Sequence, residues 1–234
     1  MVRYLVVTGT DTGVGKTVAT AGLAAALAAT GARVAVVKPV QTGLGPDDGG
    51  SDTDVVARLS GVDGVHELVR LREPLAPDTA ARLEQRVLPS VAELADEVRQ
   101  RTTGADVVLL EGAGGVRVRL DGSGGTLLDL ATALVPSGDV GVVVVVRAGL
   151  GTLNHAQLTV DAVRTAGLAV HGLVIGAWPT EPDLAARCNL DDLPAVTGLT
   201  VLALLPQGCG SWEPDAFAAA AAGWFGEWPP QLLR

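Results

Sequence analysis

The sequence predicts an α/β fold, in which a mostly parallel sheet carries helices on both of its faces. Runs rich in Val and Leu alternate with Ala-rich amphipathic segments, and the run at 140–146 is almost unbroken. Such a run has no polar face to give to water, so it fits a strand in the interior of a parallel sheet. No Gly- or Pro-rich stretch separates two halves that could each form a core, so we expect residues 1–234 to form a single domain.

Each element is predicted from its pattern and from the residues around its ends. Short aliphatic runs predict strands at 3–8, 33–37, 106–110, 140–146, 169–175 and 200–204. Amphipathic segments predict helices at 16–30, 52–60, 90–101, 152–165 and 214–224, with start signals such as Asp52, Ser90, Thr152 and Pro214. Gly- and Pro-rich stretches predict loops at 43–51, 121–125 and 177–194.

Composition and charge exclude several classes of protein. A hydrophobic fraction of 48% with 18% charged residues excludes a disordered chain. No apolar run reaches the roughly 18 residues that a membrane span requires, so we expect no membrane association. The sequence begins without the pattern of a signal or transit peptide, so we expect a cytoplasmic protein. The net charge of −9 is spread without a basic stripe, which disfavours nucleic acid and favours small-molecule partners.

The strongest motif is a Gly-rich turn between the first predicted strand and the first predicted helix. Residues 5–17 read LVVTGTDTGVGKT, which matches a phosphate-binding P-loop except that Thr10 stands where the strict pattern has Gly. Backbone N–H groups of such a loop and the helix N-terminus point at one place and favour an anion. We therefore expect a P-loop NTPase-like fold with Lys16 on the terminal phosphates and Thr17 as a Mg²⁺ ligand. The nucleotide-binding residues predicted in this segment are Gly13, Val14, Gly15, Lys16, Thr17 and Val18.

A nucleotide-dependent switch or scaffold protein is an alternative use of a P-loop. Many ATPases that partition DNA or position division sites carry an extra signature lysine near the start of the loop, in a K-G-G-x-G-K-T pattern. Asp11 occupies that place here. The sequence therefore favours an enzyme over a dimer-switching ATPase.

Two more charged residues follow predicted strands and face the same edge of the sheet. Lys38 follows 33–37 in the segment KPVQTG, and Glu111 follows 106–110 in the segment EGAGG. Ligands bind at this edge in doubly wound folds. A carboxylate there can help hold Mg²⁺ on phosphates, and the glycines let the backbone approach a ligand. Asp52 opens a predicted helix, so it is either a further Mg²⁺ ligand or only the N-cap of that helix.

Four motifs in order make the chain resemble the dethiobiotin synthetase family, and the similarity covers residues 4 to about 175. They are GTDTGVGKT at 9–17, KPVQTG at 38–43, EGAGG at 111–115 and LGTLNH at 150–155. The resemblance implies a ligase of biotin biosynthesis that uses ATP, or another nucleoside triphosphate, and Mg²⁺. Its substrates would be 7,8-diaminopelargonate and CO₂ or bicarbonate, joined through a carbamate and a carbamic-phosphoric anhydride. The nearest alternative enzyme is a related ATP-dependent amide ligase, which normally carries an added glutaminase domain.

The resemblance also implies roles for individual residues. Lys16 and Lys38 would be catalytic, and Thr17, Asp52 and Glu111 would hold Mg²⁺. The implied assembly is a homodimer with the site at the interface, and the implied substrate-binding residues are Thr42 with Gly151, Thr152, Leu153 and Asn154 of the partner subunit. Further nucleotide contacts are implied at Asp52, Glu111, Gly112, Ala113, Gly114, Gly176, Ala177, Pro206, Gln207 and Gly208. Members that use ATP usually carry an Asn-Asp pair where this chain has Gly176 and Ala177, so the resemblance leaves the preferred base open.

Overall fold

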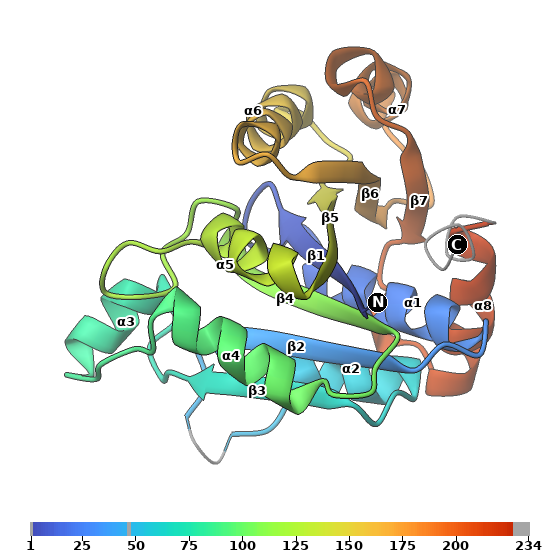
Figure 1. The fold of residues 1–234 in the computed structure, drawn as a ribbon. Coiled ribbons are helices and arrows are strands. Elements are labelled where there is room, and N and C mark those ends of the chain that lie inside the picture. The colour runs from blue at the N-terminus through green and yellow to red at the C-terminus, as the bar shows by residue number, and fades with distance from the viewer. Residues whose placement is uncertain (1, 46–47, 227–234) are drawn as a thin grey trace.

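The computed structural model describes residues 2–45 and 48–226, and within them seven strands form one sheet (Figure 1). The strand order is β3-β2-β4-β1-β5-β6-β7, and all neighbouring strands are parallel. The predicted α/β fold with a parallel sheet is confirmed. The strands are β1 (Val2–Gly9), β2 (Val34–Gln41), β3 (Val65–Arg70), β4 (Val107–Gly115), β5 (Gly138–Val146), β6 (Ala169–Trp178) and β7 (Val201–Pro206).

Helices cover both faces of the sheet. One face is covered by α1 (Lys16–Ala28), α2 (Asp52–Ser60) and α8 (Pro214–Trp224). The other carries α3 (Pro77–Leu83), α4 (Val91–Arg101), α5 (Leu127–Leu134), α6 (Thr152–Thr165) and α7 (Leu184–Thr197). Two short 3₁₀ turns are η1 (Val135–Ser137) and η2 (Cys209–Ser211). Among the residues described, no helix has the length and apolar character needed to cross a membrane.

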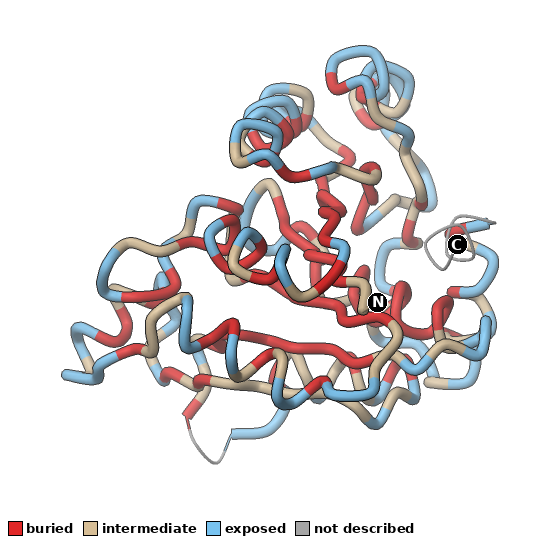
Figure 2. The backbone as a smooth tube through the Cα atoms, viewed as in Figure 1, coloured by how far each residue is buried: buried red, intermediate tan, exposed pale blue. Residues whose placement is uncertain are grey.

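The two halves of the core follow from the alternation of side chains along each strand. In β1, Tyr4 and Val6 face the α4–α7 side, whereas Leu5 and Val7 face α1, and all four are buried. The buried backbone follows the strands in Figure 2. The predicted strand at 140–146 is interior, because β5 lies between β1 and β6. The middle position of the sheet belongs to β1, whose carboxyl end leads into the P-loop.

The predicted loop at 177–194 is wrong, because most of α7 lies within it. Asp183 caps this helix by accepting a hydrogen bond from the Ala186 N–H at 2.7 Å. The helix buries Ala186 and Leu193. Its polar residues and its internal proline make the amphipathic pattern too weak to predict a helix from the sequence. No element was predicted at β3, α3 or α5 either, since β3 is a partly polar edge strand and both helices are short.

Strands β2 and β4 extend further than predicted, and this matters for the site. Lys38 and Glu111 lie within these strands and not after them. Lys38 is in register with Glu67 of β3, and Glu111 is in register with Val7 of β1. Hydrogen bonds of the sheet therefore fix the backbone at both positions, which holds functional side chains more firmly than a loop would.

The P-loop packs directly against the end of β6. A Cβ atom at Gly176 would lie 2.0 Å from the carbonyl oxygen of Val14, and a Cβ atom at Gly15 would lie 2.6 Å from the carbonyl oxygen of Gly176. Gly15 also has a φ of 96°, in the left-handed region that favours glycine. The two backbones are therefore in contact at a point where neither residue has room for a side chain.

We expect Gly176→Ala to lower the free energy of unfolding by about 1–3 kcal/mol, because the added methyl group would overpack against the P-loop backbone. Urea unfolding would measure the change. Gly223→Ala is the matched control, since a Cβ atom there meets nothing within 4 Å and alanine is the better helix former in α8. The control should be as stable as the wild type or more stable. A Gly176→Ala protein of wild-type stability would contradict the close contact.

Candidate functional site

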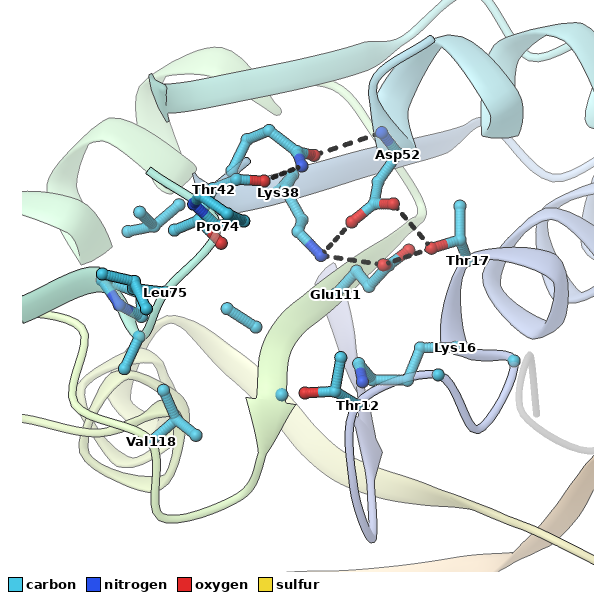
Figure 3. Close-up of a pocket in the computed structure, with 18 of the residues that line it drawn as sticks. Thr12, Lys16, Thr17, Lys38, Thr42, Asp52, Pro74, Leu75, Glu111 and Val118 are labelled. Atoms are coloured by element: carbon cyan, nitrogen blue, oxygen red, sulfur yellow. Dashed lines mark hydrogen bonds and ion pairs between the residues drawn. The ribbon is translucent and has the colours of Figure 1, made fainter. Parts of the chain in front are cut away.

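A cavity of about 710 Å³ opens at the carboxyl edge of the sheet, beside the P-loop. The P-loop and α1 form one wall, and side chains of β2, β4 and α2 form the floor (Figure 3). The segment around the start of α3, together with Val118, forms an opposite wall that is mainly apolar. Predicted site residues that line the cavity are Gly13, Gly15, Lys16, Thr17, Val18, Lys38, Thr42, Asp52, Glu111, Ala113 and Gly114.

The P-loop presents the start of α1 to this cavity. The helix begins at Lys16 after Gly15, and no side chain caps it, so the N–H groups of its first turn suit an anion. The Lys16 ammonium donates to the backbone oxygen of Asp11 at 3.0 Å. The Asp11 carboxylate in turn forms an ion pair with Arg147 at 2.6 Å. Burial, and then the charge of Lys38, lowers the pKa of Lys16.

Lys38, Asp52, Glu111 and Thr17 form a closed hydrogen-bonded cluster on the floor of the cavity (Figure 3). The Lys38 Nζ atom lies 2.5 Å from Asp52 Oδ2 and 2.9 Å from Glu111 Oε1. It also donates to the backbone oxygen of Gly112 at 3.1 Å. The Thr17 hydroxyl lies 3.0 Å from Asp52 Oδ1 and 2.9 Å from Glu111 Oε1. Lys38 is 4% exposed and Glu111 is 2% exposed, so this ion pair is shielded from water, whereas the Asp52 side chain is 33% exposed.

Charges inside the cluster support one another. Burial opposes the charge of Lys38, but Glu111 and Asp52 outweigh that effect and raise the pKa of its ammonium. Burial also opposes the charge of Asp52, but Lys38 and the hydrogen bonds from Lys38 and Thr17 outweigh it and lower the pKa of its carboxyl. Both side chains are therefore charged at neutral pH.

Ser51, and not Asp52, is the N-cap of α2. The Ser51 hydroxyl accepts from the Asp54 N–H at 3.1 Å, and the Asp54 carboxylate accepts from the Ser51 N–H at 3.0 Å. This reciprocal pair is a capping box. The interpretation of Asp52 as only an N-cap is therefore wrong. Asp52 is the first residue of the helix, and its carboxylate is directed at Thr17 and Lys38.

The donor set of the cluster fits Mg²⁺. Oxygen atoms of Thr17, Asp52 and Glu111 converge beside the P-loop, and Mg²⁺ prefers hard oxygen ligands. Across residues 2–45 and 48–226, no group of three or more His, Cys, Asp or Glu side chains could hold a metal by itself. Two carboxylates and a hydroxyl instead suit an ion that takes its remaining ligands from phosphates and water.

Other predicted site residues lie outside the lining of this cavity. Val14 is buried, and Gly112 contributes its carbonyl oxygen to Lys38. Gly176 and Ala177 lie near the end of β6, and the turn after β7 is attached there by a hydrogen bond from the Gln207 N–H to the Trp178 oxygen at 2.8 Å. The residues in this second location are Gly176, Ala177, Pro206, Gln207 and Gly208.

The predicted substrate segment at 151–154 begins α6 and is also separate from this cavity. Gly151 is the N-cap residue, with a φ of 84°, and no side chain caps the helix. Thr152 is completely buried and its hydroxyl has no hydrogen-bond partner, so it is not a side-chain cap. Asn189 of α7 donates to the backbone oxygens of Ala148 and Gly149 at 2.8 and 3.0 Å, which fixes the loop that leads into α6.

Sequence reasoning missed the apolar wall of the cavity. Pro74, Leu75, Ala76 and Pro77 lie around the start of α3, and Val118 follows β4. Leu75 is 41% exposed, which is a large exposure for a leucine beside a polar site. The run PLAP at 74–77 was the available signal, because it places apolar side chains in a segment too constrained by proline for a strand interior.

Comparisons with known proteins give concordant results. A family described as an AAA domain matches residues 3–210. An ATP-dependent dethiobiotin synthetase of Rhodococcus jostii is 56% identical, with 94% of each chain covered. One from Streptomyces coelicolor is 52% identical, with 94% of this chain and 90% of the relative covered.

Solved structures that resemble the fold include the septum site-determining protein MinD of Pyrococcus horikoshii, with a TM-score of 0.58, 18% identity and coverage of 94% of this chain and 95% of that one. Chloroplast FtsY from Physcomitrella patens has a TM-score of 0.53 and 16% identity, with 94% of this chain and 65% of that one covered. At these identities the likeness concerns the fold alone.

We expect the contribution of Asp52 to stability to disappear in acid. Because its folded-state pKa is lowered, the ionised carboxylate stabilises the protein above the usual Asp pKa of about 3.9. That contribution is lost as the pH falls through the lowered pKa. Asp52→Asn should therefore be less stable than the wild type at pH 7, and the difference should narrow near about pH 3.

Urea unfolding of both proteins at the two pH values would measure this. Asp63→Asn, at an exposed position after α2, is the matched control and should change stability little at either pH. A difference in the free energy of unfolding between Asp52→Asn and the wild type that is the same at both pH values would contradict the lowered pKa of Asp52.

Proposed function

The chain belongs to the family of ATP-dependent dethiobiotin synthetases, and we propose that it joins CO₂ to 7,8-diaminopelargonate at the cavity beside the P-loop. It is an ATP-dependent ligase that forms dethiobiotin in biotin biosynthesis. The main support for the proposed site is the cluster of Lys38, Asp52, Glu111 and Thr17 next to the P-loop. A biosynthetic enzyme that consumes ATP would work in the cytoplasm, where ATP is available.

The proposed reaction has three steps. One amine of the diamine adds to CO₂ and loses a proton, which gives a carbamate. A carbamate oxygen then attacks the γ-phosphorus of ATP and releases ADP, which gives the carbamic-phosphoric anhydride. The second amine attacks the carbamoyl carbon, loses a proton and expels phosphate, so the ureido ring closes.

Positioned positive charge is the main requirement of the phosphoryl step. Lys16 and the N–H groups at the start of α1 would bind the terminal phosphates. Mg²⁺, held by Thr17, Asp52 and Glu111, would neutralise charge on the phosphate oxygens. Lys38 reaches the same cavity from β2, so its ammonium can stabilise the carbamate and the transferring phosphoryl group.

Substrate binding would use the wall opposite the P-loop. Thr42 directly follows β2 and lines the cavity, where its hydroxyl could bind the diamine or its carbamate. Leu75, Pro74 and Val118 offer an apolar surface, which suits the methylene chain of the diamine. Enclosure by this wall would also exclude water from the reactive anhydride.

A homodimer would complete the site. The segment at 151–154 starts α6 and does not line the cavity of its own subunit, yet its free N–H groups suit the carboxylate of the substrate. Leu150 is 82% exposed and Leu158 is 61% exposed beside this segment. Exposed leucines at a helix that should bind substrate support a second subunit at this face.

Diamine-dependent phosphate release tests the proposed reaction. In the presence of a nucleoside triphosphate, CO₂ and Mg²⁺, addition of 7,8-diaminopelargonate should raise phosphate release well above the basal rate. Mass spectrometry should find one dethiobiotin formed per phosphate released. Parallel assays with ATP, CTP and GTP would establish the preferred base, and Lys16→Met is the negative control. Tight nucleotide binding without stimulation by the diamine would refute the proposed reaction.

Complementation between inactive subunits tests the shared site. Lys38→Ala should abolish the reaction in the site that uses this lysine. Asn154→Asp should repel the carboxylate of the substrate that is bound in the cavity of the partner subunit. A purified heterodimer of these two variants contains one intact site, so it should have about half of the wild-type activity. An inactive heterodimer would contradict the shared site, as would an active monomer by light scattering at assay concentration.

A further inference from the structure

Lys38 uses the same carboxylates that would bind the metal. Its ammonium has three N–H donors, and they meet Asp52 Oδ2, Glu111 Oε1 and the Gly112 oxygen at 2.5, 2.9 and 3.1 Å. Both carboxylates are therefore occupied by a charge-assisted interaction. These three contacts hold the ammonium at the floor of the cavity.

The Thr17 hydroxyl lies close to two carboxylate oxygens but has only one hydrogen to donate. It lies 3.0 Å from Asp52 Oδ1 and 2.9 Å from Glu111 Oε1, but a hydroxyl has one hydrogen and can donate to only one of them. A cation between these three oxygens would remove the conflict, because Thr17 would then coordinate through a lone pair. The geometry of the hydroxyl thus favours a metal over the hydrogen-bonded arrangement.

Metal and ammonium cannot both use Glu111 Oε1 without a penalty. This one oxygen lies 2.9 Å from Thr17 Oγ1 and also 2.9 Å from Lys38 Nζ. A dication bound there would lie next to the ammonium in a buried site, where like charges repel strongly. One of the two cations must move, and the lysine has the flexible side chain.

We propose that Lys38 and Mg²⁺ compete for Asp52 and Glu111, so that metal binding displaces the Lys38 ammonium from the carboxylates into the cavity. This inference rests on the proposed function for the identity of the metal site. Lys38 lines the cavity together with Lys16 and Thr42, so the displaced ammonium remains beside the position expected for the carbamate and the γ-phosphate. The competition would link metal binding to the presence of a free catalytic lysine.

Metal binding without nucleotide or diamine tests the competition. Mn²⁺ can replace Mg²⁺ at oxygen sites, and its free concentration can be followed by electron paramagnetic resonance. Lys38→Met should bind Mn²⁺ at least about tenfold more tightly than the wild type, because a buried positive charge no longer competes. Equal or weaker binding by Lys38→Met would overturn the proposal.

Lys16→Met is the matched control for general electrostatics. Lys16 is also a buried lysine of the cavity, and Asp52 and Glu111 act on its charge, but its ammonium donates to the Asp11 backbone. Its replacement should tighten Mn²⁺ binding clearly less than Lys38→Met does. An equal effect of the two variants would mean that overall charge, and not competition for the carboxylates, determines the affinity.

The wild-type protein provides a measurement that does not depend on the folding of a variant. In protein labelled with ¹⁵N-lysine, the buried ammonium of Lys38 should give a slowly exchanging N–H signal, which MgCl₂ should shift or broaden. A signal of Lys38 that is unchanged at saturating Mg²⁺ would overturn the proposal. Dethiobiotin formation by the wild type is measured in a separate assay. A protein that forms dethiobiotin but shows no competition would overturn only this proposal, whereas a protein that forms no dethiobiotin would overturn the proposed reaction.

Discussion

The buried ion cluster around Lys38 connects four elements that are distant in the sequence. Lys38 belongs to β2, Glu111 to β4, Asp52 to α2 and Thr17 to α1. Lys38 and Glu111 would be unfavourable in this environment without their partners, because a buried charge needs a counter-charge and hydrogen bonds. The strand order places β2 next to β4 and β4 next to β1, so the cluster forms only when the sheet has this topology. Assembly of the site therefore depends on folding of the sheet.

The fold class was predictable because the sheet is buried on both faces. Strands such as β5 must then be continuously apolar, and a Gly-rich turn before an Ala-rich helix is a strong local signal. Elements with weaker local signals were not predictable. The partly polar β3 lies at the edge, and α7 buries only a narrow side that includes Ala186 and Leu193. Their conformations are determined by packing against the rest of the protein, which single-sequence patterns do not contain.

The same distinction applies to the site. Lys16 and Thr17 carry the local signal of the P-loop motif. Lys38 and Glu111 carry a local signal because each lies near the end of an apolar strand. The role of Asp52 could not be decided locally, since Ser51 and Asp54 had first to be seen to form the cap. The run PLAP shows that Leu75 lies in a segment constrained by proline but not that it reaches the cavity. The Asp11–Arg147 ion pair joins residues that are 136 positions apart. Such contacts depend on tertiary structure and have no signature in the sequence.

The contact between Gly15 and Gly176 has an evolutionary consequence. A Cβ atom at Gly176 would collide with the Val14 carbonyl oxygen. A single substitution that added a side chain at position 176 would therefore displace the P-loop backbone. A larger residue there would require an earlier or simultaneous shift of residues 14–15. Substitutions at position 176 are thus epistatic with residues 14–15 of the P-loop, and the two segments can change only together.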